Sequence, residues 1–194
     1  MTDTEIANLA LTKIGANQIT DLTTSSAKEA VVSRQFYKTN FESVCRMHKW
    51  RCLIKRASLA KLSTTPEFGW DNEFALPSDY LQIIEAEDYY DEYTIEGNKL
   101  LSNDDTVKIR YIHLPTDLSV LDSWCLKAIY VSLAAEISYS ITQDADLRAS
   151  LIRELEDVIL PQARYYSAIE QNEPEPNHTS SWLSSRRNFY VGEW

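Results

Sequence analysis

Glycine is scarce in this sequence, with only four among 194 residues. So few glycines argue against a fold that binds nucleotides through a glycine-rich loop and against a sheet built on many tight hairpins. No window approaches the roughly 18 uninterrupted apolar residues of a membrane span, and the N-terminus lacks the basic start and apolar run of a secretion signal. We therefore expect neither a secretion signal nor a membrane anchor.

Cysteine and histidine are equally few. The three cysteines are Cys45, Cys52 and Cys125, and the three histidines are His48, His113 and His178. The cysteines are odd in number and share no C-x-x-C spacing, so neither a disulfide framework nor a zinc site is indicated, and a reducing cytoplasm is the natural setting. The histidines have no carboxylate or cysteine at ligand spacing. We expect no metal and no cofactor.

Catalytic motifs are also lacking. The sequence contains no G-x-S-x-G, no H-E-x-x-H and no Cys–His arrangement with catalytic context. The net charge of −10 and the isoelectric point near 4.8 disfavour general binding to nucleic acid or to anionic membranes, because both need a cationic face. We expect a protein that is not an enzyme.

What the chain does contain is the composition of a folded globular protein, with 44% hydrophobic and 25% charged residues. Apolar residues at helical spacing predict helices at about 3–14, 27–48, 121–143 and 144–169. The second of these helices starts with an expected capping box of Ser26 and Glu29, and Gly15 is expected to end the first. An apolar stripe is predicted along the last helix, with a kink at Pro161. Its members are Leu147, Leu151, Leu155, Val158 and Gln162.

Between the helices the pattern changes. Residues 53–62 are ambiguous between strand and helix, and 80–113 hold short β-branched or aromatic segments separated by turn residues such as Glu96-Gly97-Asn98. A small antiparallel sheet is predicted. The fold class is therefore α+β: a bundle of about four helices from residues 1–51 and 115–170, an inserted β lobe at 52–114, and an extended C-terminal tail at 171–194.

Charge is segregated along this scheme. Residues 34–61 hold eight Lys or Arg and one acid, whereas 67–105 hold twelve acids and Lys99 alone. Such polarity would steer the ordered stacking of subunits. Ordinary solvated faces that partly neutralise each other within one fold are the alternative.

Several segments, in this order, resemble the tail tubular protein A family, the head-to-tail adaptors of short-tailed phages. They are C-R-M-H-K-W at 45–50, L-I-K-R-A-S-L-A at 53–60, P-E-F-G-W at 66–70, L-P-S-D-Y-L at 76–81, Y-T-I-E-G at 93–97, K-I-R-Y-I at 108–112 and A-R-Y-Y at 163–166. The similarity spans nearly the whole chain. Arg51-Cys52 departs from the aromatic or alanine usual after the tryptophan, which affects only local packing.

The resemblance implies a homo-oligomeric ring, a dodecamer matching the portal, that joins the portal protein to the tail nozzle protein. DNA would pass through its lumen without specific binding, and no membrane would be involved. The helices and the tail would contact the portal, while the β lobe would face the nozzle. Such a protein is part of the virion tail at the portal vertex and is assembled in the host cytoplasm.

Ordering the C-terminal tail within a single subunit is expected to cost more free energy than it returns. Ordering 24 residues costs some tens of kcal/mol of backbone entropy, at about 1–2 kcal/mol each, and burying its four large aromatics returns roughly 20 kcal/mol. We therefore expect the tail to be loose in the free subunit and to anchor in the portal. The candidate anchors are Trp182, Arg186, Arg187, Phe189, Tyr190 and Trp194. A tail that folds back on its own bundle is the alternative.

Two other functions and one further surface are candidates. A murein hydrolase would use paired carboxylates among the lobe's acids, which are Glu85, Glu87, Asp88, Asp91, Glu92 and Glu96. A small helical regulator is disfavoured by the acidic total and the lack of a basic recognition helix. Tyr89, Tyr90 and Tyr93 are candidates for a nozzle-facing patch, or else belong to the core of the lobe beside Trp70 and Phe74.

Overall fold

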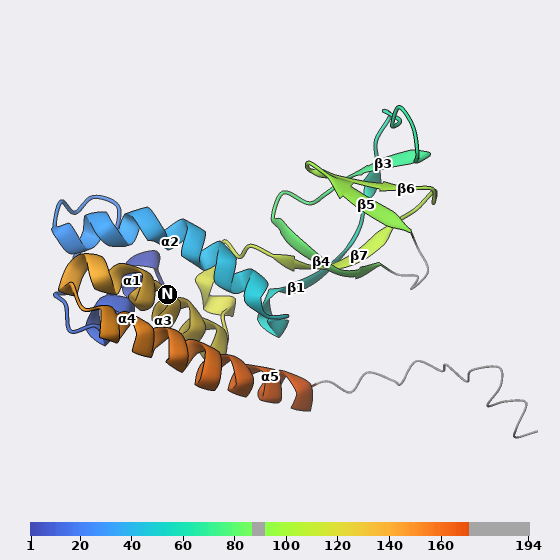
Figure 1. Cartoon of the computed structure of the whole chain (residues 1–194). Coiled ribbons are helices and arrows are strands. Elements are labelled where there is room, and N and C mark those ends of the chain that lie inside the picture. Colours follow the sequence, from blue (N-terminus) through green and yellow to red (C-terminus); the bar gives the residue numbers. More distant parts are fainter. Residues whose placement is uncertain (87–91, 171–194) are drawn as a thin grey trace, which may run out of the picture.

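The computed structural model describes residues 1–86 and 92–170, and it has the predicted α+β architecture, with helices at both ends and strands between them (Figure 1). The helices are α1 (Asp3–Lys13), α2 (Lys28–Met47), α3 (Ser123–Thr142), α4 (Ala145–Arg153) and α5 (Leu160–Ile169). The strands are β1 (Ile54–Ser58), β2 (Ala60–Lys61), β3 (Asn72–Ala75), β4 (Tyr80–Ala86), β5 (Tyr93–Glu96), β6 (Lys99–Ser102) and β7 (Lys108–His113). Short 3₁₀ turns occupy Arg51–Leu53 (η1) and Leu118–Val120 (η2).

Helix α3 forms the centre of the bundle and packs against α1, α2 and α4. It is rich in buried small and branched residues, and Ile129, Leu133 and Ile137 are fully buried. One polar link crosses this core: Asn40 on α2 donates to the Ile129 carbonyl at 3.2 Å and accepts from the Ser132 hydroxyl at 2.6 Å. The link satisfies two buried polar side chains and thereby fixes the register of α2 on α3.

The helix ends agree with the sequence in one case and differ in the other. Gly15, at φ +71°, follows α1 in the left-handed conformation that a glycine adopts at no steric cost. The capping box expected at Ser26 is wrong. Helix α2 has Ala27 as its N-cap and no side-chain cap, so Glu29 is one position too early to complete a box. A capping box occurs instead at α1, between Thr2 and Glu5.

Between α4 and α5 the chain forms a π-helical turn, Glu154–Ile159 (η3), that ends just before Pro161. This wider turn shifts the phase of the side chains that follow it. The predicted stripe is right as far as Leu155 but wrong at Val158 and Gln162, which are exposed. The buried positions are instead Ile159, Leu160 and Ala163, and the π turn keeps Leu155, Ile159 and Ala163 at a four-residue spacing directed at the core.

The strands form two antiparallel sheets rather than the single one predicted. The three-stranded sheet has the order β1-β7-β4 and adjoins the helices, and the four-stranded sheet has the order β2-β3-β6-β5 (Figure 1). A second, smaller core lies between them, centred on Phe74, Leu100 and Ile109. The predicted turn at Gly97, with φ +58°, joins β5 to β6. The ambiguous residues 53–62 form mainly β1 and β2.

Candidate interaction surfaces

A groove of about 560 Å³ lies where the helices meet the three-stranded sheet. We call it the basic groove. The end of α2 and the last turns of α5 form one side, and β1, β4 and β7 form the other, with Ile54, Ile83 and Ile112 among its apolar lining. Its charged lining residues are Arg46, Lys49, Arg51, Arg110 and Arg164, with Glu85 as the single acid.

The cations of the groove differ in their partners. Arg110 Nε lies 2.9 Å from Glu85 Oε1, and Arg51 donates from Nε to the Ser167 carbonyl at 2.9 Å. Arg46, Lys49 and Arg164 form no ion pair with any residue that the structure describes. Three charges of the groove are therefore not neutralised by any described residue.

The pKa of His48 is affected by the charges of this groove. It ends α2, is half-buried, and its Nε2 lies 3.0 Å from the Ser167 hydroxyl. Burial lowers the pKa of His48, and the positive charges of Arg164 and Lys49 lower it further. The imidazole is consequently neutral at pH 7 and adds no charge to the site.

Two other cations of the basic segment are neutralised within the subunit. Lys55 pairs with Asp79 at 2.8 Å, and Lys61 pairs with Asp105 at 3.0 Å. The alternative, that the two charged segments partly neutralise each other, therefore holds for these two lysines, whereas Arg46, Lys49 and Arg164 form no ion pair with a described residue.

The opposite charge gathers at one end of the four-stranded sheet, here called the acidic end and consisting of Asp71, Glu92 and Asp104. Asn72 and Tyr93 both pair in register with Ser102, so the residues before them and those after Ser102 share that end. No described cation forms an ion pair with these three carboxylates. Phe68, three residues before Asp71, is 87% exposed. The acidic end lies on the side of the β lobe away from the helices (Figure 1).

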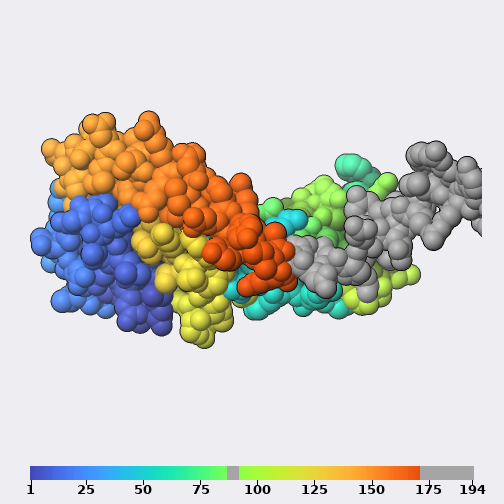
Figure 2. All heavy atoms as spheres, turned by 90° about the horizontal axis from the view of Figure 1, so that it is seen from below, coloured from blue at the N-terminus to red at the C-terminus, as the bar shows by residue number. Residues whose placement is uncertain are grey.

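The last helix offers an apolar surface. Figure 2 shows α4 and α5, in orange, running along one face of the bundle. On α5, Tyr165 and Ile169 are 63% and 62% exposed, and Tyr166 stacks on Trp124 with ring centroids 5.5 Å apart. Exposed apolar and aromatic side chains of this kind are common at protein interfaces.

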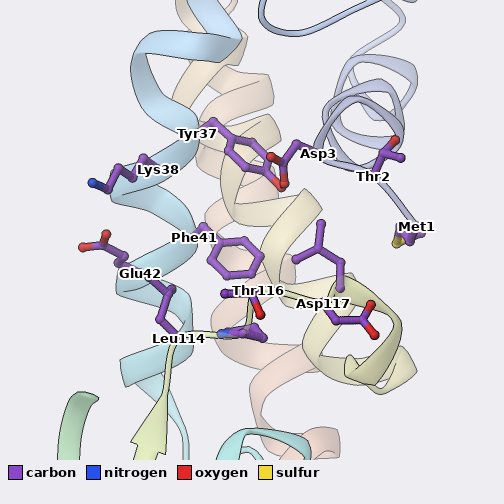
Figure 3. A pocket seen from close by; sticks show the side chains of 12 residues that line it. Met1, Thr2, Asp3, Tyr37, Lys38, Phe41, Glu42, Leu114, Thr116 and Asp117 are labelled. Atoms are coloured by element: carbon purple, nitrogen blue, oxygen red, sulfur yellow. The ribbon is translucent and has the colours of Figure 1, made fainter. Parts of the chain in front are cut away.

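A second cavity, of about 570 Å³, lies between the start of α1, the middle of α2 and the segment after β7 (Figure 3). Tyr37 projects into it and donates a hydrogen bond to Asp3 Oδ1 at 2.8 Å. Burial and that hydrogen bond raise the pKa of Tyr37, so the phenol stays protonated near pH 7 and does not act as a base. Lys38 and Glu42 lie at the rim with opposite charges.

Of the three tyrosines proposed from sequence, Tyr93 lies within the described residues. Tyr93 is half-buried and packs against the small core of the β lobe, of which buried Phe74 is a member. Tyr89, Tyr90 and the tail residues from Trp182 to Trp194 lie outside the described residues, so their roles stay predictions. His113 is buried, with Nδ1 2.8 Å from the Leu53 carbonyl, which is a structural role.

Sequence spacing missed one cluster. Cys45 and Cys125 are buried in the bundle core, and half-buried Cys52 packs against the same core and donates to Asp122.

Within residues 1–86 and 92–170, no three His, Cys, Asp or Glu are arranged to hold a metal ion. No helix in the same ranges is long and apolar enough to cross a bilayer. Comparison with protein-family models and with curated proteins yields no match for this chain.

Proposed function

We propose that this chain is a structural adaptor subunit of a tailed bacteriophage. It would form a ring between the portal and the tail nozzle, with a lumen for DNA. One observation carries the proposal: among the described residues, three cations of the basic groove and the three carboxylates of the acidic end form no ion pair, and the two sets belong to different parts of the fold. A ring subunit needs two distinct surfaces of this kind, since each copy contacts a neighbour on either side.

The two-part architecture agrees with a connecting role. The helical bundle and the tail, with Trp182, Arg186 and Trp194 among its anchors, are proposed to contact the portal. The β lobe with Tyr93 is proposed to face the nozzle. The net charge of −10 suits a lumen wall that does not retain DNA.

The rival murein hydrolase finds less support in the described acids. Glu85 is engaged with Arg110. Glu92 and Glu96 stand just before and at the end of four-residue β5, so their backbones are about 13 Å apart at about 3.3 Å per residue. Glycosidase carboxyl groups are about 5–9.5 Å apart. Glu87, Asp88 and Asp91 lie outside the described residues.

Removing the tail tests the proposed portal contact. A chain lacking residues 172–194 should keep a folded bundle by circular dichroism and lose attachment to the portal assembly. A truncated chain that still attaches would exclude the tail as the anchor. A zymogram on peptidoglycan tests the alternative function, because cleared zones with the purified protein would favour the murein hydrolase.

A further inference from the structure

The basic groove has the features of an occupied site. Its lining combines three cations that form no ion pair within residues 1–86 and 92–170 with apolar side chains from α2, β1 and β4, among them Met47, Ile54 and Ile83. An ordinary solvated surface is seldom both concave and apolar, and a protein core seldom holds charged side chains without ion pairs. Such a groove fits a ligand that carries both carboxylates and an apolar group.

The acidic end of the same chain has that chemistry. Asp71, Glu92 and Asp104 supply three carboxylates, and Asp71 is held in place by a hydrogen bond from its backbone nitrogen to Asn103 Oδ1 at 3.1 Å. Phe68 stands on the loop that leads to this end and is 87% exposed. An exposed phenyl ring at this place is available to fill an apolar floor on a partner surface.

Within one subunit, no ion pair among the described residues joins these two surfaces. The groove lies at the junction with the helices, and the acidic end lies on the far side of the lobe (Figure 1). We propose that the acidic end of one copy, with Phe68, docks in the basic groove of the next copy. This inference rests on the proposed function, for which it supplies the contact between neighbours. A contact between two different surfaces repeats head to tail, and it closes into a ring when the rotation per copy allows.

Charge reversal tests the contact. Arg46→Glu with Lys49→Glu changes the groove, and Asp71→Lys with Glu92→Lys changes the acidic end; all four side chains are exposed, so folding should persist. Self-association of the full chain, measured by analytical ultracentrifugation at low salt, should weaken at least tenfold, corresponding to about 1.4 kcal/mol, in either double variant. It should also weaken in the wild type at high salt.

The four substitutions together give the sharpest comparison. This chain has the wild-type net charge, with the signs of groove and end exchanged, and it should regain self-association. The matched control is Lys28→Glu with Arg153→Glu, two exposed cations elsewhere on the bundle, which changes the net charge as the groove variant does and should associate like the wild type. A wild-type chain that stays monomeric at low salt, or a groove variant that associates like the control, would overturn the inference.

Portal binding separates this inference from the proposed function. A chain that self-associates through these surfaces but ignores the portal would overturn the adaptor role and leave the contact standing. A groove variant that covers the portal with the wild-type number of copies would overturn the contact and leave the role standing.

Discussion

Cys52 Sγ donates a hydrogen bond to Asp122 Oδ2 at 3.3 Å, and Asp122 Oδ1 in turn accepts from the backbone nitrogen of Cys125 at 2.8 Å. Asp122 is the N-cap of α3, and Cys52 lies in η1, where the chain leaves the bundle for the strands. One carboxylate therefore holds together the exit from the bundle and the return to it, across 70 residues of sequence.

The three cysteines should differ in the reactivity of their thiols. A hydrogen bond from Cys125 lowers the pKa of half-buried Cys52, whereas burial raises the pKa of Cys45 to about 12. A hydrogen bond with Cys52 and burial raise the pKa of Cys125. Because the thiolate is the reactive form, one thiol should react quickly with iodoacetamide and two only after unfolding. Mass spectrometry should place the fast label on Cys52, and a fast phase that persists in Cys52→Ser would contradict the assignment.

The π-helical turn predicts opposite outcomes for two adjacent residues. Ile159 is fully buried, so Ile159→Ala should lower the free energy of unfolding by about 2–4 kcal/mol. Val158 is 44% exposed, and Val158→Ala should change it by less than about 0.5 kcal/mol. Urea denaturation of both variants measures the difference. Equal losses would show that the helix continues without the phase shift.

Ser33 predicts a stabilising substitution. Its side chain is fully buried on α2, and its hydroxyl has no hydrogen-bond partner among the described residues. Ser33→Ala removes that unsatisfied group and improves helix propensity, so the free energy of unfolding should rise by about 0.5–1.5 kcal/mol. The matched control is Ser138→Ala, since the equally buried Ser138 donates to the Ala135 carbonyl at 2.9 Å. A gain no larger than the control's would refute the explanation.

Asp21 predicts a pH dependence of stability. Hydrogen bonds from the Thr23 hydroxyl and from the backbone nitrogens of Thr24 and Thr23 lower its pKa from 3.8 to about 2. A lowered folded-state pKa means that the contribution of Asp21 is complete above about pH 4 and is lost as the pH falls toward 2. The difference in stability between the wild type and Asp21→Asn, measured by denaturation at several pH values, should shrink across that window. A constant difference would contradict the pKa.

Periodicity predicted the helices because each has an apolar face that must be buried against the others, as Ile6, Ile129 and Leu151 are. It could not predict the π turn, since the phase shift at Ile159 depends on packing against α3 and not on local spacing. Division of the strands into two sheets was equally hidden, because the pairing of Asn72 with Ser102 joins residues 30 positions apart.

The candidate surfaces likewise depend on contacts between residues that are distant in the sequence. The sequence shows that acidic and basic residues are segregated. It does not show which cations form ion pairs within the subunit. Lys55 finds Asp79 across the sheet, while Arg46 finds no partner among the described residues. Arg164, more than 110 residues further along, joins Arg46 in the groove only through the packing of α5 beside the end of α2.

The most direct test of the adaptor role is a mass measurement, with negative-stain imaging, of the purified chain alone and mixed with the portal assembly of its phage. If the chain is the adaptor, rings should cap the portal, with a defined number of 22.3 kDa copies in each complex. A chain that remains separate from the portal, with no ring and no gain in the mass of the portal assembly, would contradict it.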